Sequence, residues 1–133
     1  MDAQRATTRP VVLVVEDEFL IRMDAIDMVR AAGFEAIEAC DADEAIDILQ
    51  SRSDIAVVFT DIQMPRSMDG LRLAAAVSDR WPPIKIIAAS GQFRLGGDDL
   101  PRGSRFLPKP YSPSEVAVHL RDLTGFDPGR GSV

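Results

Sequence analysis

Val57-Val58-Phe59-Thr60-Asp61 is a short run of β-branched and aromatic residues that ends on an acid. Such residues favour β-strands, so the run predicts a strand with Asp61 at its carboxyl end. Open α/β sheets bind their ligands at the carboxyl ends of the strands, where a carboxylate is well placed for chemistry. Taken alone, the acid has an ordinary alternative role as a cap of the following loop. Asp61 is therefore a candidate functional residue whose interpretation depends on its neighbours in the fold.

Strand-like and helix-like segments alternate along the rest of the chain. Val11–Val15 is a continuous apolar run, typical of a strand that is buried on both faces of a parallel sheet. Strands are expected at residues 11–15, 34–39, 55–60, 84–89 and 105–107, and helices at residues 19–32, after 41, from 70 to 80 and from 112. This alternation predicts an α/β fold, a doubly wound, five-stranded parallel sheet with helices on both faces. The glycines and prolines of residues 92–103 predict a short or irregular fourth helix.

The composition indicates one folded domain. The chain has 133 residues and a hydrophobic fraction of 46%, which is ordinary for a globular protein. Its formal net charge of −6 argues against direct nucleic-acid binding, which needs a basic patch. Cys40 is the only cysteine, so no intrachain disulfide forms, and this suits a reducing cytoplasm. The sequence has no secretory leader and no membrane-spanning apolar run, so we expect a cytoplasmic protein that binds no membrane.

The ends of the chain differ from its middle. Residues 1–10 are polar and are expected to form a flexible N-terminal arm. Residues 11–124 hold all the predicted strands and helices and form the expected domain. Residues 125–133 contain glycines and are expected to form a flexible C-terminal tail.

Polar residues follow or end four of the predicted strands. They are Glu16 and Asp17, then Asp61, then Ser90, and finally Lys109. The carboxyl ends of parallel strands meet at one edge of a sheet, so these side chains are expected to converge. Each residue has an ordinary explanation by itself, as a loop cap, a strand-end serine or a solvated lysine. Their occurrence together, in this order, favours a shared functional site.

Converging carboxylates repel one another, and a hard divalent cation relieves that repulsion. Magnesium prefers a few carboxylate oxygens, keeps several waters and accepts phosphate oxygens as its remaining ligands. We therefore expect Mg²⁺ to be bound directly by Asp17 and Asp61 and through a water by Glu16. The backbone carbonyl of Gln63 is expected to complete the protein's share of the ligands.

A strand-end aspartate beside a metal ion and a lysine is suited to accept a phosphoryl group. Phosphoryl transfer needs mainly alignment and charge neutralisation, so little further machinery is required. In this interpretation Asp61 is the nucleophile and Lys109 supplies a compact cation to the phosphoryl oxygens. Ser90 supplies a hydroxyl hydrogen bond, and Gly91 leaves room beside the backbone.

These motifs together resemble the receiver domain of bacterial two-component response regulators, over residues 11–123. The matching segments are Val14–Asp17, Thr60–Pro65, Met68–Gly70, Ser90-Gly91 and Lys109-Pro110. The resemblance implies a flavodoxin-like (βα)5 fold and, since no second domain follows residue 123 in this sequence, a stand-alone response regulator. It implies that Asp61 is phosphorylated by a histidine kinase or phosphotransfer protein, with Mg²⁺ at Glu16 and Asp17. Catalysis would be limited to the chain's own phosphorylation and slow dephosphorylation, and output would pass through contacts with a downstream protein partner.

The resemblance also implies a switch, in which Ser90 and Lys109 sense the phosphoryl group. In this family an aromatic residue three positions before the lysine takes part, often a tyrosine, and here it is Phe106. Phenylalanine has no hydroxyl to signal with, so Tyr111 is a candidate for part of the surface readout. The irregular segment 92–103 is a second departure from the family pattern.

Three other functions compete with this interpretation. A haloacid-dehalogenase-like phosphatase also phosphorylates a strand-end aspartate, but it needs a second acid two residues later, where this chain has Gln63. A flavodoxin-like cofactor module needs a phosphate-binding loop after the first strand, where three acids stand at residues 16–18. A phosphate shuttle or sink within a phosphorelay has the same site and differs only in its partners.

Overall fold

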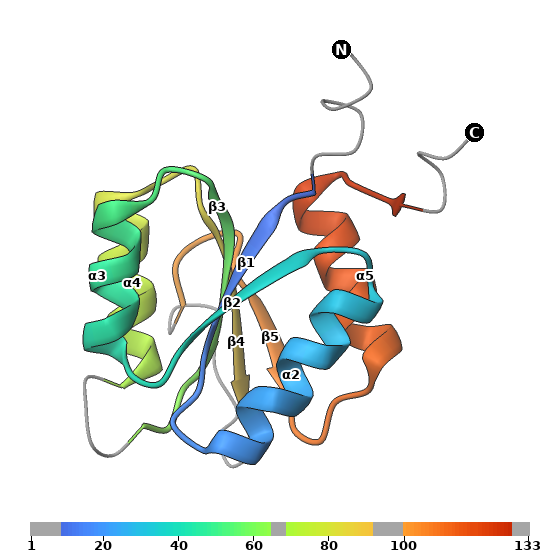
Figure 1. The fold of residues 1–133 in the computed structure, drawn as a ribbon. Helices are drawn as coiled ribbons and strands as arrows, with labels where there is room; N and C mark the ends of the chain where they lie inside the picture. The colour runs from blue at the N-terminus through green and yellow to red at the C-terminus, as the bar shows by residue number, and fades with distance from the viewer. Residues whose placement is uncertain (1–8, 65–68, 92–99, 129–133) are drawn as a thin grey trace.

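The structure is a computed structural model that describes residues 9–64, 69–91 and 100–128 (Figure 1). Five strands form one parallel sheet in the order β2-β1-β3-β4-β5. The strands are β1 (Val11–Val15), β2 (Glu35–Ala39), β3 (Ile55–Asp61), β4 (Lys85–Ser90) and β5 (Arg105–Pro108). The helices of the described residues are α2 (Phe19–Ala31), α3 (Ala42–Ser51), α4 (Gly70–Arg80) and α5 (Pro113–Thr124). This order confirms the predicted doubly wound, flavodoxin-like fold.

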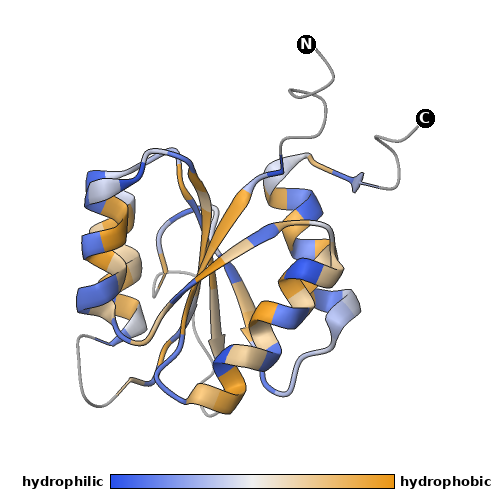
Figure 2. Cartoon of the chain, viewed as in Figure 1, coloured by the Kyte–Doolittle hydropathy of each residue, from blue (hydrophilic) through white to orange (hydrophobic). Residues whose placement is uncertain are grey.

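The sheet lies between two layers of helices, with α3 and α4 on one face and α2 and α5 on the other (Figure 1). The buried residues separate accordingly into two hydrophobic clusters. Strand β1 is buried along its whole length, and its residues alternate between the two clusters. Leu13 packs with α3 and α4, whereas Val12 and Val14 pack with α2 and α5. Figure 2 shows the same arrangement, with hydrophobic residues along the sheet and hydrophilic residues on the outer sides of the helices.

Local capping explains where three of the helices begin. Asp41 accepts the Glu44 N–H at the start of α3, and Asp69 accepts the Arg72 N–H at the start of α4. Ser112 and Glu115 form a reciprocal capping box at α5, and Pro113 is the first helical residue. The helices predicted after residue 41 and from residue 112 therefore begin at these caps.

Three strands, β3, β4 and β5, extend one residue beyond their predicted ranges at the carboxyl end. Asp61 is the last residue of β3, and Ser90 is the last residue of β4. Both side chains are therefore placed by sheet hydrogen bonding rather than by a loop. Parallel pairing sets Asp61 beside Ala89, and it sets Ser90 beside Pro108 at the end of β5.

A short or irregular helix was predicted between β4 and β5, at residues 92–103. Residues 92–99 of that segment lie outside the described residues. Residues 101–104 form a turn in which the Ser104 N–H donates to the Pro101 carbonyl at 3.0 Å. Of the predicted N-terminal arm, the structure describes Arg9 and Pro10, and the Pro10 carbonyl accepts the Glu35 N–H at 3.1 Å. Among the described residues, no helix combines the length and the apolar character needed to cross a bilayer.

The chain continues to pack against the domain after α5. Gly125 ends the helix in the left-handed conformation, with φ of 72°, which glycine adopts without strain. The Phe126 ring then meets the Phe34 ring edge-on, with 5.5 Å between the centroids. Residues 125–128, the start of the predicted tail, thus contact the domain, and residues 129–133 lie outside the described part of the chain.

Candidate functional site

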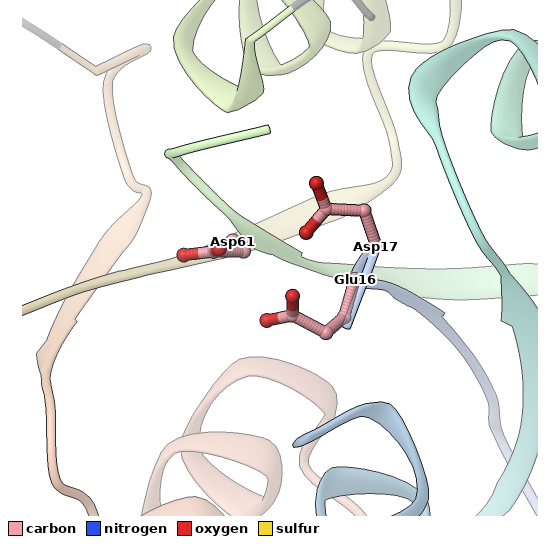
Figure 3. Close-up of side chains that lie close together, drawn as sticks. All are labelled: Glu16, Asp17 and Asp61. Carbon is pink, nitrogen blue, oxygen red and sulfur yellow. The ribbon is translucent and has the colours of Figure 1, made fainter. Parts of the chain in front are cut away.

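Three carboxylates gather at the carboxyl edge of the sheet (Figure 3). Glu16 and Asp17 follow β1 directly, and Asp61 ends the neighbouring strand β3. The β1–β3 register pairs Val15 with Thr60, which brings the residues that follow them to the same level. One ligand oxygen from each of the three side chains lies within 4.8 Å of the others. The structure therefore brings together the three acids that the sequence assigned to one site.

Two of these acids are buried, and burial changes their chemistry. Glu16 is 4% exposed and Asp61 is 6% exposed. The pKa of Glu16 is raised to about 7, mainly by desolvation and also by the charge of Asp61 and a hydrogen bond with Asp17. The Glu18 N–H donates to Glu16 Oε2 at 2.9 Å and, with the charge of Lys109, partly opposes this rise in pKa. Burial therefore disfavours the charged form of Glu16 beside the Asp61 carboxylate.

Lys109 supplies the cation of the site. Its Nζ lies 3.0 Å from Asp61 Oδ1 and 3.6 Å from Glu16 Oε1. The backbone fixes this lysine, because its N–H donates to the Ser90 carbonyl at 2.9 Å as β4 and β5 end together. The Lys109–Pro110 peptide bond is cis. The ammonium thus comes from a strand two positions away from β3 in the sheet and still reaches its last residue.

Asp61 Oδ1 is buried and has no hydrogen-bond donor of acceptable geometry among the described residues, although the Lys109 ammonium is close. An unsatisfied buried carboxylate oxygen is costly, and a metal ion is one of the ways to satisfy it. The donor set of three carboxylates suits a hard cation with oxygen ligands, such as Mg²⁺. The three acids present therefore fit the predicted ion, and the roles of Asp17 and Asp61 as direct ligands with Glu16 beside them stay predictions.

Ser90 lies at the edge of this cluster and is 1% exposed. Its hydroxyl donates to Gln63 Oε1 at 3.5 Å. The sequence assigned only the backbone carbonyl of Gln63 to the site, and that assignment stays a prediction. The side-chain contact was missed, although the parallel pairing of β3 with β4 indicates that residues just beyond Asp61 lie beside Ser90.

Helix α4 starts directly against the acid cluster. The Gly70 N–H donates to the Ile62 carbonyl at 2.8 Å. A Cβ at residue 70 would overlap the carbonyl oxygen of Asp61 and the Cα of Ile62. Glycine is required here for close approach, so the Met68-Asp69-Gly70 motif contributes to the site through backbone packing.

The two candidate readout aromatics lie in different surroundings. Phe106 in β5 is half-buried. Tyr111 is also half-buried, and its ring packs on the Phe59 ring with 5.5 Å between the centroids. Burial first, and then the charges of Glu16 and Asp61, raise the pKa of Tyr111 to about 12. Tyr111 is therefore electrostatically coupled to the acid cluster, and the readout roles of both aromatics stay predictions.

The sequence and the fold are similar to those of known proteins. The protein-family model of the response regulator receiver domain matches residues 12–121. The transcriptional regulatory protein PdtaR of Mycobacterium tuberculosis is 37% identical over 136 residues, which cover 95% of this chain and 65% of PdtaR. The sensor kinase CckA of Brucella abortus is 32% identical over 116 residues, which cover 84% of this chain and 12% of CckA. A solved structure of a response regulator receiver protein from Pseudomonas putida has a TM-score of 0.77 and 28% identity, covering 86% of this chain and 98% of that chain.

The chain belongs to the response regulator receiver domain family. Receiver domains are signalling modules of two-component systems rather than enzymes, and they receive phosphoryl groups from histidine kinases. This membership confirms the resemblance drawn from the strand-end motifs. The chain spans less than two thirds of the length of each of the two curated relatives described above.

Proposed function

We propose that this chain is a single-domain response regulator that accepts a phosphoryl group on Asp61 and signals through protein–protein contacts. The observation that carries the proposal is the buried Asp61 carboxylate, which has two acids as neighbours and the Lys109 ammonium at 3.0 Å. This arrangement matches what an aspartyl nucleophile needs, because phosphoryl transfer depends on alignment and on charge neutralisation.

The step itself is a displacement at phosphorus. An Asp61 carboxylate oxygen forms a bond to the phosphorus of a phosphohistidine, and the phosphorus–nitrogen bond breaks. The departing imidazole nitrogen keeps the electron pair. Asp17 and Asp61, with Glu16 beside them, would hold Mg²⁺, which would supply positive charge next to the phosphoryl oxygens. Lys109 neutralises a phosphoryl oxygen, and Ser90 turns its hydroxyl from Gln63 toward the new group.

The phosphodonor has to dock beside this site, and the start of α2 offers a suitable surface. Phe19 and Leu20 are 61% and 76% exposed, and they follow Asp17 by only two and three residues. Exposed large apolar side chains next to a reactive group are typical of a protein-binding surface. A cavity of about 300 Å³ lined by Ile21, Met28 and Tyr111 lies close by. We propose that a histidine kinase or a phosphotransfer protein binds this surface, and that the downstream partner binds the phosphorylated state.

The phosphatase alternative is weaker at one residue. A phosphatase of this kind needs a second acid two positions after the nucleophile as its general acid and base. Gln63 stands there, and its amide does not ionise at neutral pH, so it cannot take that role. A shuttle or sink within a phosphorelay remains compatible with the same chemistry. The fate of the phosphoryl group after Asp61 separates it from a signalling output.

The test is phosphorylation of the purified chain by acetyl phosphate with Mg²⁺, followed by intact mass. One labile phosphoryl adduct is expected on the wild type and none on Asp61→Asn. The matched control is Asp54→Asn, because Asp54 is an exposed acid at the opposite end of β3 and pairs with Arg52 at 2.6 Å. An adduct that persists in Asp61→Asn contradicts the proposal, and so does rapid turnover of an external phosphomonoester.

A further inference from the structure

Arg22 is a second cation close to the acid cluster, and no motif in the sequence singled it out. Its side chain lies on α2 and is 12% exposed. The guanidinium Nη1 donates to the backbone carbonyl of Glu16 at 2.8 Å. Its Nε donates to Glu38 Oε1, also at 2.8 Å, and its Cζ lies 5.5 Å from the centroid of the Phe19 ring. One side chain thus joins the loop after β1, the end of β2 and the first turn of α2.

The contact with Glu16 is made to the backbone, and this decides what Arg22 can do. The carbonyl of Glu16 belongs to the peptide that links Glu16 to Asp17, so holding it fixes the directions in which both carboxylates leave the backbone. Arg22 therefore acts on the acid cluster through the position of the loop rather than as a counter-ion.

The loop has few other restraints. The Glu16 N–H donates to the Ala39 carbonyl at 3.1 Å, and the Glu18 N–H donates to the carboxylate of Glu16. Helix α2 lacks a side-chain cap at Glu18, in contrast to the side-chain caps at Asp41, Asp69 and Ser112. Among the residues that the structure describes, Arg22 is a side chain from outside the loop that holds its middle peptide to the rest of the fold. A planar guanidinium can hold two oxygens at once, which an ammonium cannot do in the same geometry.

We propose that Arg22 is a positioning residue of the metal site, which orients the Glu16–Asp17 peptide so that both carboxylates face Asp61. Glu38 and Phe19 hold the guanidinium in place from its other sides. This inference rests on the proposed function, because it assumes that the acid cluster binds Mg²⁺. Residues that orient metal ligands from behind typically contribute 10–100-fold to metal affinity, so the effect is large enough to measure.

The test is a Mg²⁺ titration of the full chain followed by backbone amide NMR, which reports affinity and the metal-free loop together. Arg22→Met keeps the apolar stem and removes every donor, and it is expected to weaken Mg²⁺ binding by about tenfold. It is also expected to shift the amides of residues 16–18 before any metal is added. Arg22→Lys keeps one cationic donor, and its affinity is expected to lie between those of Arg22→Met and the wild type.

Arg30→Met is the matched control, because Arg30 lies on the same helix and also donates to a backbone carbonyl, that of Ala36, at 3.4 Å. It should bind Mg²⁺ as the wild type does, even where its thermal unfolding changes. Wild-type affinity in Arg22→Met overturns this inference alone, and so does an equal loss of affinity in Arg30→Met. A wild-type chain with no Mg²⁺-dependent shifts at Asp17 and Asp61 overturns the proposed metal site as well.

Discussion

Glu16 has a buried carboxylate that serves the fold and the site at the same time. It accepts the Glu18 N–H at the start of α2, and it lies 3.6 Å from the Lys109 ammonium. Burial nevertheless raises its pKa to about 7. In the absence of a metal, and at a pH between 4.5 and about 7, the folded chain therefore keeps a proton on Glu16 that the unfolded chain has released. This residue therefore makes stability depend on pH in the direction opposite to that of an acid in a favourable ion pair.

The first residue-scale prediction follows from this raised pKa. Below the ordinary glutamate pKa of 4.5, both states are protonated and Glu16 contributes no pH dependence. Between that value and about 7, only the folded state keeps the proton, so the free energy of unfolding falls as the pH rises. Glu16→Gln cannot ionise, and its urea-measured stability in EDTA should fall less between pH 5 and pH 8 than that of the wild type.

The exposed Glu35 provides the control for this measurement, because Glu35→Gln removes one acid without touching the cluster. Its pH profile should follow the wild type. Parallel profiles for the wild type and Glu16→Gln would show that burial of the Glu16 carboxylate does not govern the pH dependence of folding.

At the scale of the elements, α4 is the helix most closely tied to the reacting end of β3. Gly70 has no side chain, so the first turn of α4 lies directly against the backbone of Asp61 and Ile62. Asp69 caps the same turn by accepting the Arg72 N–H at 2.9 Å. A shift of this turn would therefore be transmitted to the nucleophile through backbone contact.

Gly70→Ala tests this coupling. The added methyl group overlaps backbone atoms, which cannot rotate away, so α4 has to move or β3 has to bend. We expect a loss of about 2 kcal/mol in the free energy of unfolding, as is typical of overpacking, and slower phosphorylation by acetyl phosphate.

Ala75→Gly is the control, since Ala75 is exposed in the middle of the same helix. It should lose about 1 kcal/mol from helix propensity and should keep the wild-type rate of phosphorylation. Equal phosphorylation rates in Gly70→Ala and the wild type would contradict a role for the α4 start in shaping the site.

At the scale of the whole molecule, the acid cluster and the segment that follows α5 lie at opposite ends of the strands. The carboxyl ends of the strands hold the site, whereas Phe126 packs on Phe34, which immediately precedes β2. Pro128 comes so close to Gly33 that a Cβ at residue 33 would overlap its ring. The segment after α5 is therefore a stabilising contact that is remote from the chemistry.

Phe126→Ala should separate stability from phosphorylation. Loss of the ring removes an aromatic pair and half-buried apolar surface, so we expect a loss of about 2 kcal/mol in the free energy of unfolding. The rate of phosphorylation by acetyl phosphate, measured well below the melting temperature, should stay at the wild-type value. Val118→Ala, at an exposed apolar position on α5, should change the unfolding free energy by no more than about 0.5 kcal/mol. Unfolding curves that coincide for Phe126→Ala and Val118→Ala would show that the aromatic contact contributes nothing.

Much of the fold could be predicted because its signals lie within a few neighbouring residues. The apolar run at residues 11–15 predicted a strand buried on both faces, and a helix was predicted from residue 112, the N-cap of α5. The order of strand-end residues predicted which acids and which lysine would share a site. The same reasoning could not find the contacts of Arg22 with Glu16 and Glu38, or that of Phe126 with Phe34. No fixed separation along the sequence indicates such contacts.

The linear chain was sufficient to establish the family, the alternation of strands and helices, and the kinds of side chain at each strand end. Strand propensity, apolar periodicity and helix capping act over short distances along the chain, so they can be recognised without coordinates. Folding in three dimensions was needed to place the Lys109 ammonium 3.0 Å from Asp61, to pair Ser90 with Gln63 and to bring Arg22 onto the loop of Glu16. These distances depend on the register of the sheet and on helix packing across both faces, and no short stretch of sequence contains either.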